Sequence, residues 1–275
     1  MIRDLARLFR LHLACLNGIA ALGGLCLFPG PFRAVELLVA FSGVTLLAMG
    51  GSALNQVLER DLDALMTRTN QRPLPRRRLS ITTAVLAGTC TILAGLALLA
   101  STGAMLPPLI GAIALAWYLA VYTPLKRATT LALPLGALCG AFPPLIGWCL
   151  AGGNPTDFRV ITLAGLLFIW QIPHFWLLQE RHEADYQRGG IPLIRIEATL
   201  VGRNMLFWLW LMAFIAGAML LPAFGMIGSP AALWYAAFPV PLILLALMHS
   251  RKLLFTYLNL FPVLLTLLLF FRNSV

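Results

Sequence analysis

Seven long stretches of the chain contain no Asp, Glu, Lys or Arg, and they limit the possible folds more than any other feature. They cover residues 11–32, 37–58, 79–125, 128–156, 160–179, 204–250 and 253–271. A helix needs about 20 mostly apolar residues to cross the hydrocarbon part of a bilayer. Only 11% of the 275 residues are charged, whereas a soluble domain carries about 25%. The sequence therefore predicts an all-α polytopic membrane protein.

The lengths of these stretches predict the number of spans. The runs 79–125 and 204–250 are each long enough for two helices, and each contains a Pro/Gly turn near its middle. The other runs hold one helix each. We therefore expect nine transmembrane helices within a single domain, residues 1–275. Their approximate ranges are 11–29, 34–54, 81–101, 106–122, 132–151, 160–178, 203–221, 231–248 and 253–271.

Basic residues are unevenly divided between the two sides that these nine spans define. All 20 Lys and Arg residues except Arg33, Arg159 and Arg272 fall on the side of the N-terminus. Because cytoplasmic loops carry an excess of Lys and Arg, we expect this side to face the cytoplasm. The net charge of +10 is then explained by topology and by contact with anionic lipid. Nucleic acid is not an expected partner.

Topology does not explain the acidic residues. Of ten Asp and Glu residues, seven fall in the predicted loops after the second and sixth spans: Glu59, Asp61, Asp63, Glu180, Glu183, Asp185 and Glu197. Acidic residues at the ends of membrane helices usually have a function. We therefore expect a functional site on the cytoplasmic side.

The first of these loops has a regular spacing of oxygen ligands. Asn55, Glu59 and Asp63 are four residues apart and share one helix face if the second span continues. Such a face suits Mg²⁺, which uses one or two carboxylates together with substrate phosphate oxygens. The alternative is a solvated loop, which would leave this spacing unexplained.

Basic residues accompany these ligands. Arg68 and Arg72 follow in the same loop, and guanidinium groups match the geometry of phosphate. Lys126, in the short loop after the fourth span, is either a phosphate contact or a topological anchor. Asp61 points away from the ligand face, so we expect it to pair with Arg60 or Arg68.

A histidine near the end of the sixth span is a second candidate. His174 follows Pro173 and precedes Asp185 by eleven residues, close to three helical turns, so both side chains could face one cavity. A packed, hydrogen-bonded histidine is an equally good interpretation. With His182 and His249 it forms no zinc-binding spacing.

Together these patterns resemble the UbiA-type intramembrane prenyltransferases. The likeness rests on the Asn-x₃-acid-x₃-Asp run from Asn55, the Arg-Thr-x-x-Arg-Pro-Leu run from Arg68, and Tyr-x-x-x-Lys-Arg from Tyr122. It covers roughly residues 50 to 195. Three further features resemble one branch, the protoheme IX farnesyltransferases: Asp63-x-x-Met66-x-Arg68-Thr69, the run Gly140 to Trp148, and Pro173-His174-Phe175-Trp176 with Asp185-Tyr186 downstream.

The resemblance implies a fold and a set of site residues. The nine helices would surround a central cavity that opens to the cytoplasmic side and to lipid. The implied catalytic residues are Asn55, Glu59, Asp63, His174 and Asp185. The implied Mg²⁺ ligands are Asn55, Glu59, Asp63 and Asp185, and the implied diphosphate contacts are Arg68, Arg72, Lys126 and Arg127. Glu59 stands where much of the superfamily has Asp, and the second motif contains fewer aspartates than is usual.

The resemblance also implies a reaction. Farnesyl diphosphate would lose diphosphate, the vinyl group of protoheme IX would attack the allylic cation, and water would capture the resulting cation. Haem propionates would need cationic partners, for which Arg76, Arg77, Arg78 and Arg188 are available. His174 could be a haem contact, a proton handler or a structural residue. The implied surroundings are membrane lipid in a bacterial-type inner membrane, with haem A synthase or the terminal oxidase assembly as protein partners.

Three alternatives stay open at this point. The same fold could prenylate another acceptor, such as a hydroxybenzoate, homogentisate or chlorophyllide. Nine spans would also suit a secondary transporter, although no inverted repeat is evident. The third alternative is a paralogue without catalytic activity.

Overall fold

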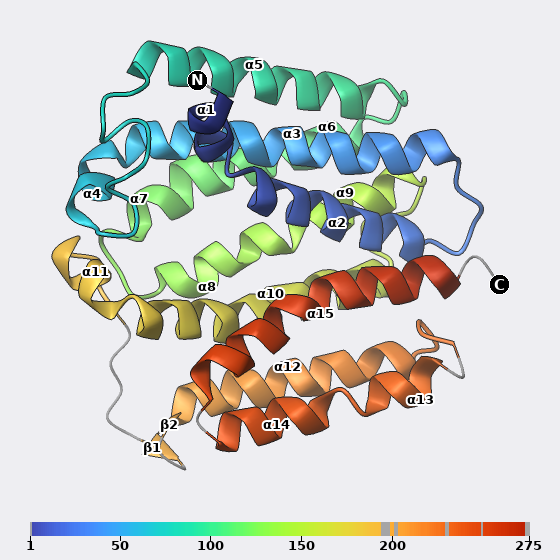
Figure 1. Ribbon diagram of the computed structural model, residues 1–275. Coiled ribbons are helices and arrows are strands. Elements are labelled where there is room, and N and C mark those ends of the chain that lie inside the picture. The colour runs from blue at the N-terminus through green and yellow to red at the C-terminus, as the bar shows by residue number, and fades with distance from the viewer. Residues whose placement is uncertain (1, 194–198, 201–202, 229–230, 249, 273–275) are drawn as a thin grey trace.

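The computed structural model describes residues 2–193, 199–200, 203–228, 231–248 and 250–272. Glu197, predicted in the loop after the sixth span, and His249 lie outside these ranges. Most of the described chain is helical, and the long helices run side by side between the two ends of the molecule (Figure 1).

The first half of the chain forms short helices at one end and long helices across the molecule. They are α1 (Ile2–Phe9), α2 (Leu11–Leu27), α3 (Ala34–Leu58), α4 (Arg60–Leu65), α5 (Ile81–Ala100), α6 (Leu106–Ala116), the π-helix η1 (Trp117–Tyr122), α7 (Thr123–Leu125), α8 (Ala132–Ala137) and the 3₁₀-helix η2 (Leu138–Gly140).

The second half adds α9 (Phe142–Leu150), α10 (Phe158–Arg181), α11 (Glu183–Arg188), α12 (Met205–Ala223), α13 (Ala231–Ala236), α14 (Pro239–Leu247) and α15 (Arg251–Arg272). Between α11 and α12, the two-residue strands β1 (Thr199–Leu200) and β2 (Arg203–Asn204) pair in antiparallel fashion.

The helices confirm the predicted membrane fold, and the predicted number of spans is approximate. Within the described ranges, seven apolar segments are long enough to cross a membrane: Ala34–Leu58, Ile81–Ala100, Leu106–Leu125, Ala132–Leu150, Phe158–Arg181, Met205–Ala223 and Arg251–Phe271. The pair α1 and α2, bent by 47°, makes an eighth. The remaining predicted span corresponds to a shorter apolar segment, Ala231–Leu247.

The bend between α1 and α2 has a local cause. Arg10 has φ 47° and ψ 50°, a left-handed conformation that ends α1. The last carbonyl groups of a helix lack partners within the helix. Here the buried Gln56 of α3 is that partner, because its Nε2 donates to the carbonyl oxygens of Arg7 (3.2 Å) and Leu8 (2.6 Å). The N-terminal helix is therefore fixed against α3, next to Asn55.

Glycines allow α2 and α9 to pack closely. A Cβ atom at Gly24 would lie 1.9 Å from the carbonyl oxygen of Pro144, and one at Gly147 would lie 1.8 Å from that of Ala21. Small residues allow such close approach between membrane helices. The run from Gly140 to Trp148 thus forms part of the helix packing, and Trp148 is 1% exposed.

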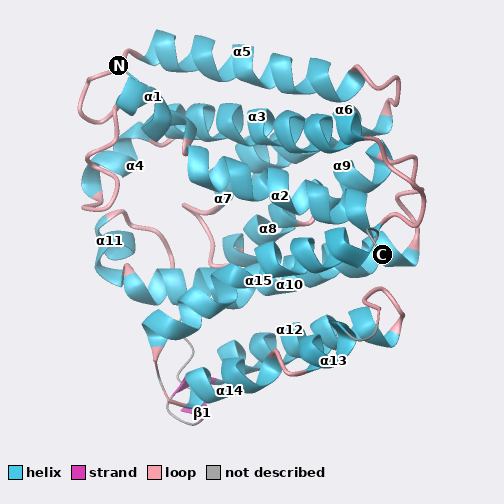
Figure 2. Cartoon of the chain, turned by 45° about the vertical axis from the view of Figure 1, so that its right-hand side comes forward, coloured by secondary structure: helices cyan, strands magenta, loops and turns pink. Residues whose placement is uncertain are grey.

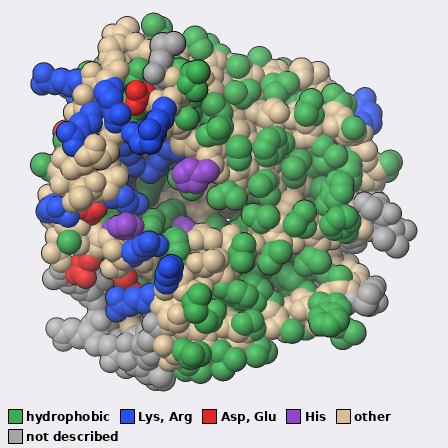
Figure 3. Space-filling model, in the orientation of Figure 1, with side chains coloured by type: hydrophobic (Ala, Val, Ile, Leu, Met, Phe, Trp, Pro, Cys, Tyr) green, Lys and Arg blue, Asp and Glu red, His purple; other side chains and the backbone are tan. Residues whose placement is uncertain are grey.

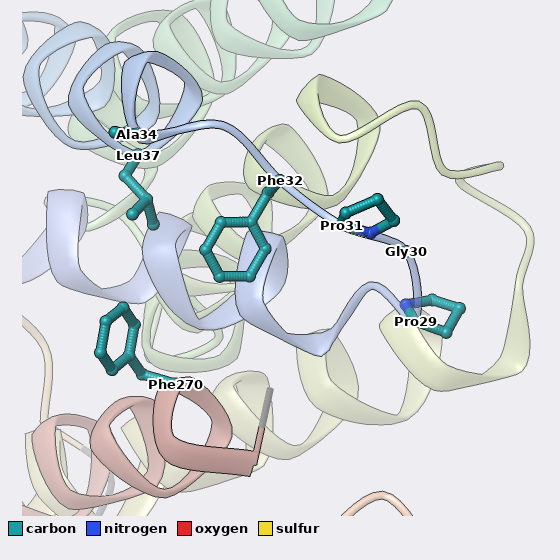
Figure 4. A pocket seen from close by; sticks show the side chains of 7 residues that line it. All are labelled: Pro29, Gly30, Pro31, Phe32, Ala34, Leu37 and Phe270. Carbon is teal, nitrogen blue, oxygen red and sulfur yellow. The ribbon is translucent and has the colours of Figure 1, made fainter. Parts of the chain in front are cut away.

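The two ends of the molecule differ in chemistry. One end carries α1, α4, α7 and α11, with their connecting loops (Figures 1 and 2). The opposite end contains a pocket of about 500 Å³ beside the α2–α3 loop, lined by Pro29, Gly30, Pro31, Phe32, Ala34, Leu37 and Phe270 (Figure 4). This lining offers no charged side chain, so the ionic chemistry must be sought at the first end.

Candidate active site

The first motif keeps its predicted spacing although the helix is interrupted. Helix α3 ends at Leu58, and Glu59 separates it from α4 with φ −112° and ψ 13°. Hydrogen bonds four residues apart nevertheless continue, from Glu59 N to Asn55 O (3.0 Å) and from Asp63 N to Glu59 O (2.7 Å). The three side chains therefore follow one another at successive turns, as the sequence predicted.

Glu59 forms a buried ion pair with Lys126. Glu59 is 3% exposed, and Lys126 Nζ lies 2.5 Å from Glu59 Oε1 and 2.6 Å from Glu59 Oε2. Only Oε2 is aligned as a hydrogen-bond acceptor, so Oε1 is a buried oxygen without an aligned donor. Burial lowers the pKa of Lys126, and the Glu59 carboxylate opposes that shift. This lysine therefore has a buried partner of opposite charge.

Asp63 forms the next ion pair, with Arg72. The residue is 1% exposed, and Arg72 Nη1 lies 2.7 Å from Oδ1 and 2.6 Å from Oδ2. The Thr69 hydroxyl donates to the backbone carbonyl of Asp63 at 3.0 Å, which fixes the turn between them. Burial lowers the pKa of Arg72, the charge of Arg10 lowers it further, and Asp63 opposes both.

Asn55 is fixed by the π-helix η1. Its Nδ2 donates to the hydroxyl of Thr123 (3.0 Å), and that hydroxyl donates to the carbonyl of Tyr118 (2.7 Å). The backbone N–H of Thr123 also bonds to Tyr118 O, five residues earlier, which is the π-helical pattern. Such π-helical turns are often found at functional sites. Thr123 thus joins the first motif to the turn that carries Lys126.

Asp185, from the second motif, connects two loops. It accepts hydrogen bonds from the backbone N–H groups of Thr67 (2.8 Å) and Arg68 (3.0 Å), and from Arg188 Nη2 (2.6 Å). Burial would raise the pKa of Asp185, but the backbone N–H groups and the Arg188 charge outweigh it and hold the pKa below its usual value. The Arg68 guanidinium lies 5.9 Å from the centre of the Tyr186 ring.

Asp61 has a partner that differs from the prediction. Asp61 was predicted to pair with Arg60 or Arg68, and this prediction is wrong: it pairs with Arg127, at 2.9 and 3.0 Å. The hydrogen bond from Arg127 lowers the pKa of Asp61 to about 2. Arg127 also donates to Leu58 O at 3.1 Å. Both side chains are more than one third exposed, so this pair lies at the surface and not with the buried acids.

His174 belongs to α10, and its ring contacts Phe255 of α15. Its ring stacks between Trp170 (centroids 5.1 Å apart) and Phe255 (5.0 Å). Its Nδ1 is buried without a hydrogen-bond partner.

The described residues form no ready metal-binding cluster of three or more acidic, His or Cys side chains. Basic side chains also bond to the acids that are present: Lys126 to Glu59, Arg72 to Asp63 and Arg188 to Asp185. The donors are nevertheless carboxylate and amide oxygens, the type that Mg²⁺ prefers. A metal ion could be held here if these cations moved to another anion.

The surface charge agrees with this arrangement. Arg and Lys side chains gather at the end of α4 and α11, around a hollow beside which histidines lie (Figure 3). The arrangement combines buried carboxylates, basic side chains and an opening at one end, which suits a ligand carrying phosphate groups.

Sequence reasoning missed several contributors. Thr69 and Thr123 position the first motif, while Phe255 stacks on His174. A signal existed for Thr123, which lies one helical turn before Lys126. None existed for α15, because its residues are distant in sequence from the motifs.

The sequence is similar to one family model and to individual known proteins. The model of the UbiA prenyltransferase family matches residues 17–270. A protoheme IX farnesyltransferase of Geobacter sulfurreducens is 56% identical over 265 residues, which cover 96% of this chain and 97% of that protein. Another, from Oleidesulfovibrio alaskensis, is 37% identical over 84% of this chain and 81% of its own.

Solved structures share the fold. A UbiA homologue of Aeropyrum pernix has a TM-score of 0.76 at 21% identity, covering 96% of this chain and 99% of its own. A UbiA homologue of Archaeoglobus fulgidus, bound to GPP and Mg²⁺, has a TM-score of 0.69 at 15% identity and covers 99% of this chain and 100% of its own. Since the family model matches nearly the whole sequence, the chain belongs to the UbiA prenyltransferase family.

Proposed function

We propose that this integral membrane protein transfers a farnesyl group from farnesyl diphosphate to a vinyl group of protoheme IX, giving haem O and diphosphate. The observation that carries the proposal is the 56% identity to a protoheme IX farnesyltransferase over 96% of this chain and 97% of that protein. The branch resemblance seen at Asp63, Gly140 and His174 agrees with the names of these relatives.

The basic residues of the site would bind the diphosphate. Arg72 and Lys126 are half-buried and bonded to the acids of the first motif, and Arg68 belongs to the turn that Asp185 holds. On binding, these cations would exchange carboxylate for phosphate oxygens and stabilise the charge that develops as diphosphate leaves. Arg127 remains a predicted fourth contact, although it is bonded to Asp61 at the surface.

Magnesium fits the donor chemistry of the first motif. Asn55, Glu59 and Asp63 offer oxygen donors at successive turns, and Glu59 Oε1 is buried without an aligned donor. We propose that these three residues hold the ion and that Asp185 contributes from the facing loop. When bound, the ion supplies positive charge toward the leaving diphosphate.

The acceptor would lie beneath the diphosphate, with its apolar macrocycle among the helices. Its propionates would be close to the basic end, where Arg76, Arg77, Arg78 and Arg188 are exposed. We place this end on the cytoplasmic side of the inner membrane, from the distribution of basic residues. Haem A synthase and the terminal oxidase assembly remain the predicted protein partners.

The test is farnesyl transfer by the purified protein in lipid nanodiscs. Protoheme IX, farnesyl diphosphate and Mg²⁺ are supplied, and extracted haems are separated and identified by mass. We expect a product carrying one farnesyl group and one added water. Absence of any farnesylated haem, or preferential prenylation of hydroxybenzoate or homogentisate offered in parallel, would contradict the proposal.

A further inference from the structure

Arg10 joins α1 to α2 in a backbone conformation that arginine rarely adopts. Its φ of 47° and ψ of 50° lie in the left-handed region, which is unfavourable for most side chains. Arg10 is also the N-cap of α2, a position that favours Ser, Thr, Asp, Asn or Gly, and its side chain makes no capping hydrogen bond. Helix capping therefore does not explain this arginine. Residues held in such strained conformations cluster at functional sites.

Contacts on both sides of the bend hold Arg10 in place. Leu8 is fully buried in a cluster with residues of α3, α5 and the loop after α4. Asp4 forms an ion pair with Arg78 of the same loop at 3.3 Å. Gln56 of α3 binds the last carbonyl groups of α1. Arg10 is therefore fixed relative to α3 and to the loop after α4.

The packing of α2 on α3 places Arg10 at the level of the first motif. The two helices are antiparallel (Figure 1), and they pack closely at Gly18, where a Cβ atom would lie 2.3 Å from Thr45 Oγ1. Arg10 precedes Gly18 by eight residues, roughly 12 Å along α2. The same rise along α3 leads from Thr45 to Ala53, two residues before Asn55. Arg10 therefore lies at the level where the first motif begins.

The charge of Arg10 acts on the two cations that bind the first motif. Burial lowers the pKa of Arg72, and the positive charge of Arg10 lowers it further. Burial also lowers the pKa of Lys126; the Glu59 carboxylate opposes this shift, and the charge of Arg10 adds to it. Because salt screens exposed charges beyond about 10 Å, the three cationic groups lie near one another.

These cations outnumber the acids of the first motif. Glu59 bonds to Lys126 and Asp63 bonds to Arg72, so both buried carboxylates already have a partner. The half-buried Arg10 forms no ion pair with any residue that the structure describes. A third positive charge beside two others is unfavourable unless an anion neutralises it. One positive charge is therefore left for an anionic ligand.

We propose that Arg10 is a further binding residue for the prenyl diphosphate, and that its guanidinium donates hydrogen bonds to phosphate oxygens. The inference rests on the proposed function, which provides the diphosphate. A guanidinium presents a planar fork of N–H groups that matches two phosphate oxygens. Arg72 and Lys126 would bind the diphosphate from loops, and Arg10 would bind it from the bend between the first two helices. Arg10 lies outside residues 50 to 195, which carry the family resemblance.

Arg10→Asn separates the charge of the side chain from the strain of the backbone. Asparagine adopts the left-handed conformation more readily than arginine does, so the thermal midpoint of this variant should equal or exceed that of the unaltered protein. Binding is measured by calorimetry in nanodiscs with Mg²⁺ and without an acceptor. Both farnesyl diphosphate and inorganic diphosphate should bind about 10-fold more weakly to the variant.

Two further variants are the controls. Arg7→Gln removes an exposed cation one turn earlier, whose backbone carbonyl and not its side chain contacts Gln56. It should bind both anions within about 2-fold of the unaltered protein. Arg10→Lys keeps the charge but loses the fork, so its affinity for both anions should lie between those of Arg10→Asn and the unaltered protein.

Several outcomes would overturn the proposal. One is affinity of Arg10→Asn for both anions equal to that of the unaltered protein. Another is a loss of affinity confined to protoheme IX, since Arg10 would then face the acceptor. If Arg10→Asn does not fold, the same titrations with Arg10→Gly decide, because glycine adopts this conformation freely. Unaltered protein that binds both anions but transfers no farnesyl group to protoheme IX would instead contradict the proposed function.

Discussion

The two acidic motifs bury their carboxylates equally well but hold them with different partners. Glu59 and Asp63, in the first motif, are bonded to the side-chain cations of Lys126 and Arg72. Asp185, in the second, is bonded to two backbone N–H groups of the facing loop as well as to Arg188. Side-chain cations have several rotatable bonds and can move to a phosphate, whereas backbone N–H groups cannot leave without moving the loop.

The different partners indicate different roles for the two motifs. The first motif holds carboxylates whose partners can be exchanged for a ligand. Asp185 joins the loop that follows α4 to α11, and Gly189 packs against Leu62 and Met66 beside it. We therefore expect the first motif to determine ligand binding and catalysis. We expect Asp185 also to hold the loop after α4 against α11.

Asp63→Asn should have the largest effect. The amide keeps the size of the side chain but loses the charge that holds Arg72 and would hold the metal, so farnesyl transfer should fall by about 100-fold or more. The matched control is Asp61→Asn, because Asp61 is exposed and pairs with Arg127 at the surface. Equal activity of the two variants in the nanodisc assay would remove the basis for the first motif as the ligand site.

Lys126→Met should rank second. It removes a phosphate contact and leaves the buried Glu59 without its cation, so the thermal midpoint should fall, and affinity for farnesyl diphosphate should decrease by about 10-fold or more. Lys252→Met, at an exposed position, provides the control for loss of a lysine. The assignment would fail if calorimetry gave the same affinity for both variants.

Asp185→Asn should have an intermediate effect, of about 10-fold on transfer, because an amide accepts fewer of its hydrogen bonds. The effect that distinguishes this variant should be confined to the loop after α4. Hydrogen exchange at the backbone N–H groups of Thr67 and Arg68 should accelerate, while that of α3 should not change. Unaltered exchange at these two residues would show that Asp185 does not hold the loop.

Arg127→Gln should have the smallest effect. Its ion pair with Asp61 is largely exposed, and such pairs contribute about 0–1 kcal/mol. We expect transfer within about 2-fold of the unaltered protein and a similar thermal midpoint. A loss of affinity for farnesyl diphosphate comparable to that of Lys126→Met would instead establish Arg127 as a diphosphate contact.

The sequence predicted those features that depend on local periodicity. Charge-free runs predicted the apolar helices, and the spacing of Asn55, Glu59 and Asp63 survives the break at Glu59 because the four-residue hydrogen bonds continue. It could not predict partners. Asp61 with Arg127, and Asp185 with Thr67, are 66 and 118 residues apart, and only the packing of helices decides which charges meet.

The same limit applies to His174. Its sequence context suggested a polar group at membrane depth, but left a haem contact, a proton handler and a packed residue equally open. The aromatic neighbour Phe255 comes from α15, which is 81 residues away in the sequence (255 − 174). The structure adds the stacking of the His174 ring with Trp170 and Phe255.

The most direct test of the account is divalent metal binding, measured by the electron paramagnetic resonance of Mn²⁺ with and without farnesyl diphosphate. The account predicts weak binding to the protein alone, because Lys126 and Arg72 occupy the carboxylates. Binding should become at least about 10-fold tighter with farnesyl diphosphate, and this gain should vanish in Asp63→Asn. Equal Mn²⁺ affinity with and without the diphosphate, or an unchanged gain in Asp63→Asn, would contradict it.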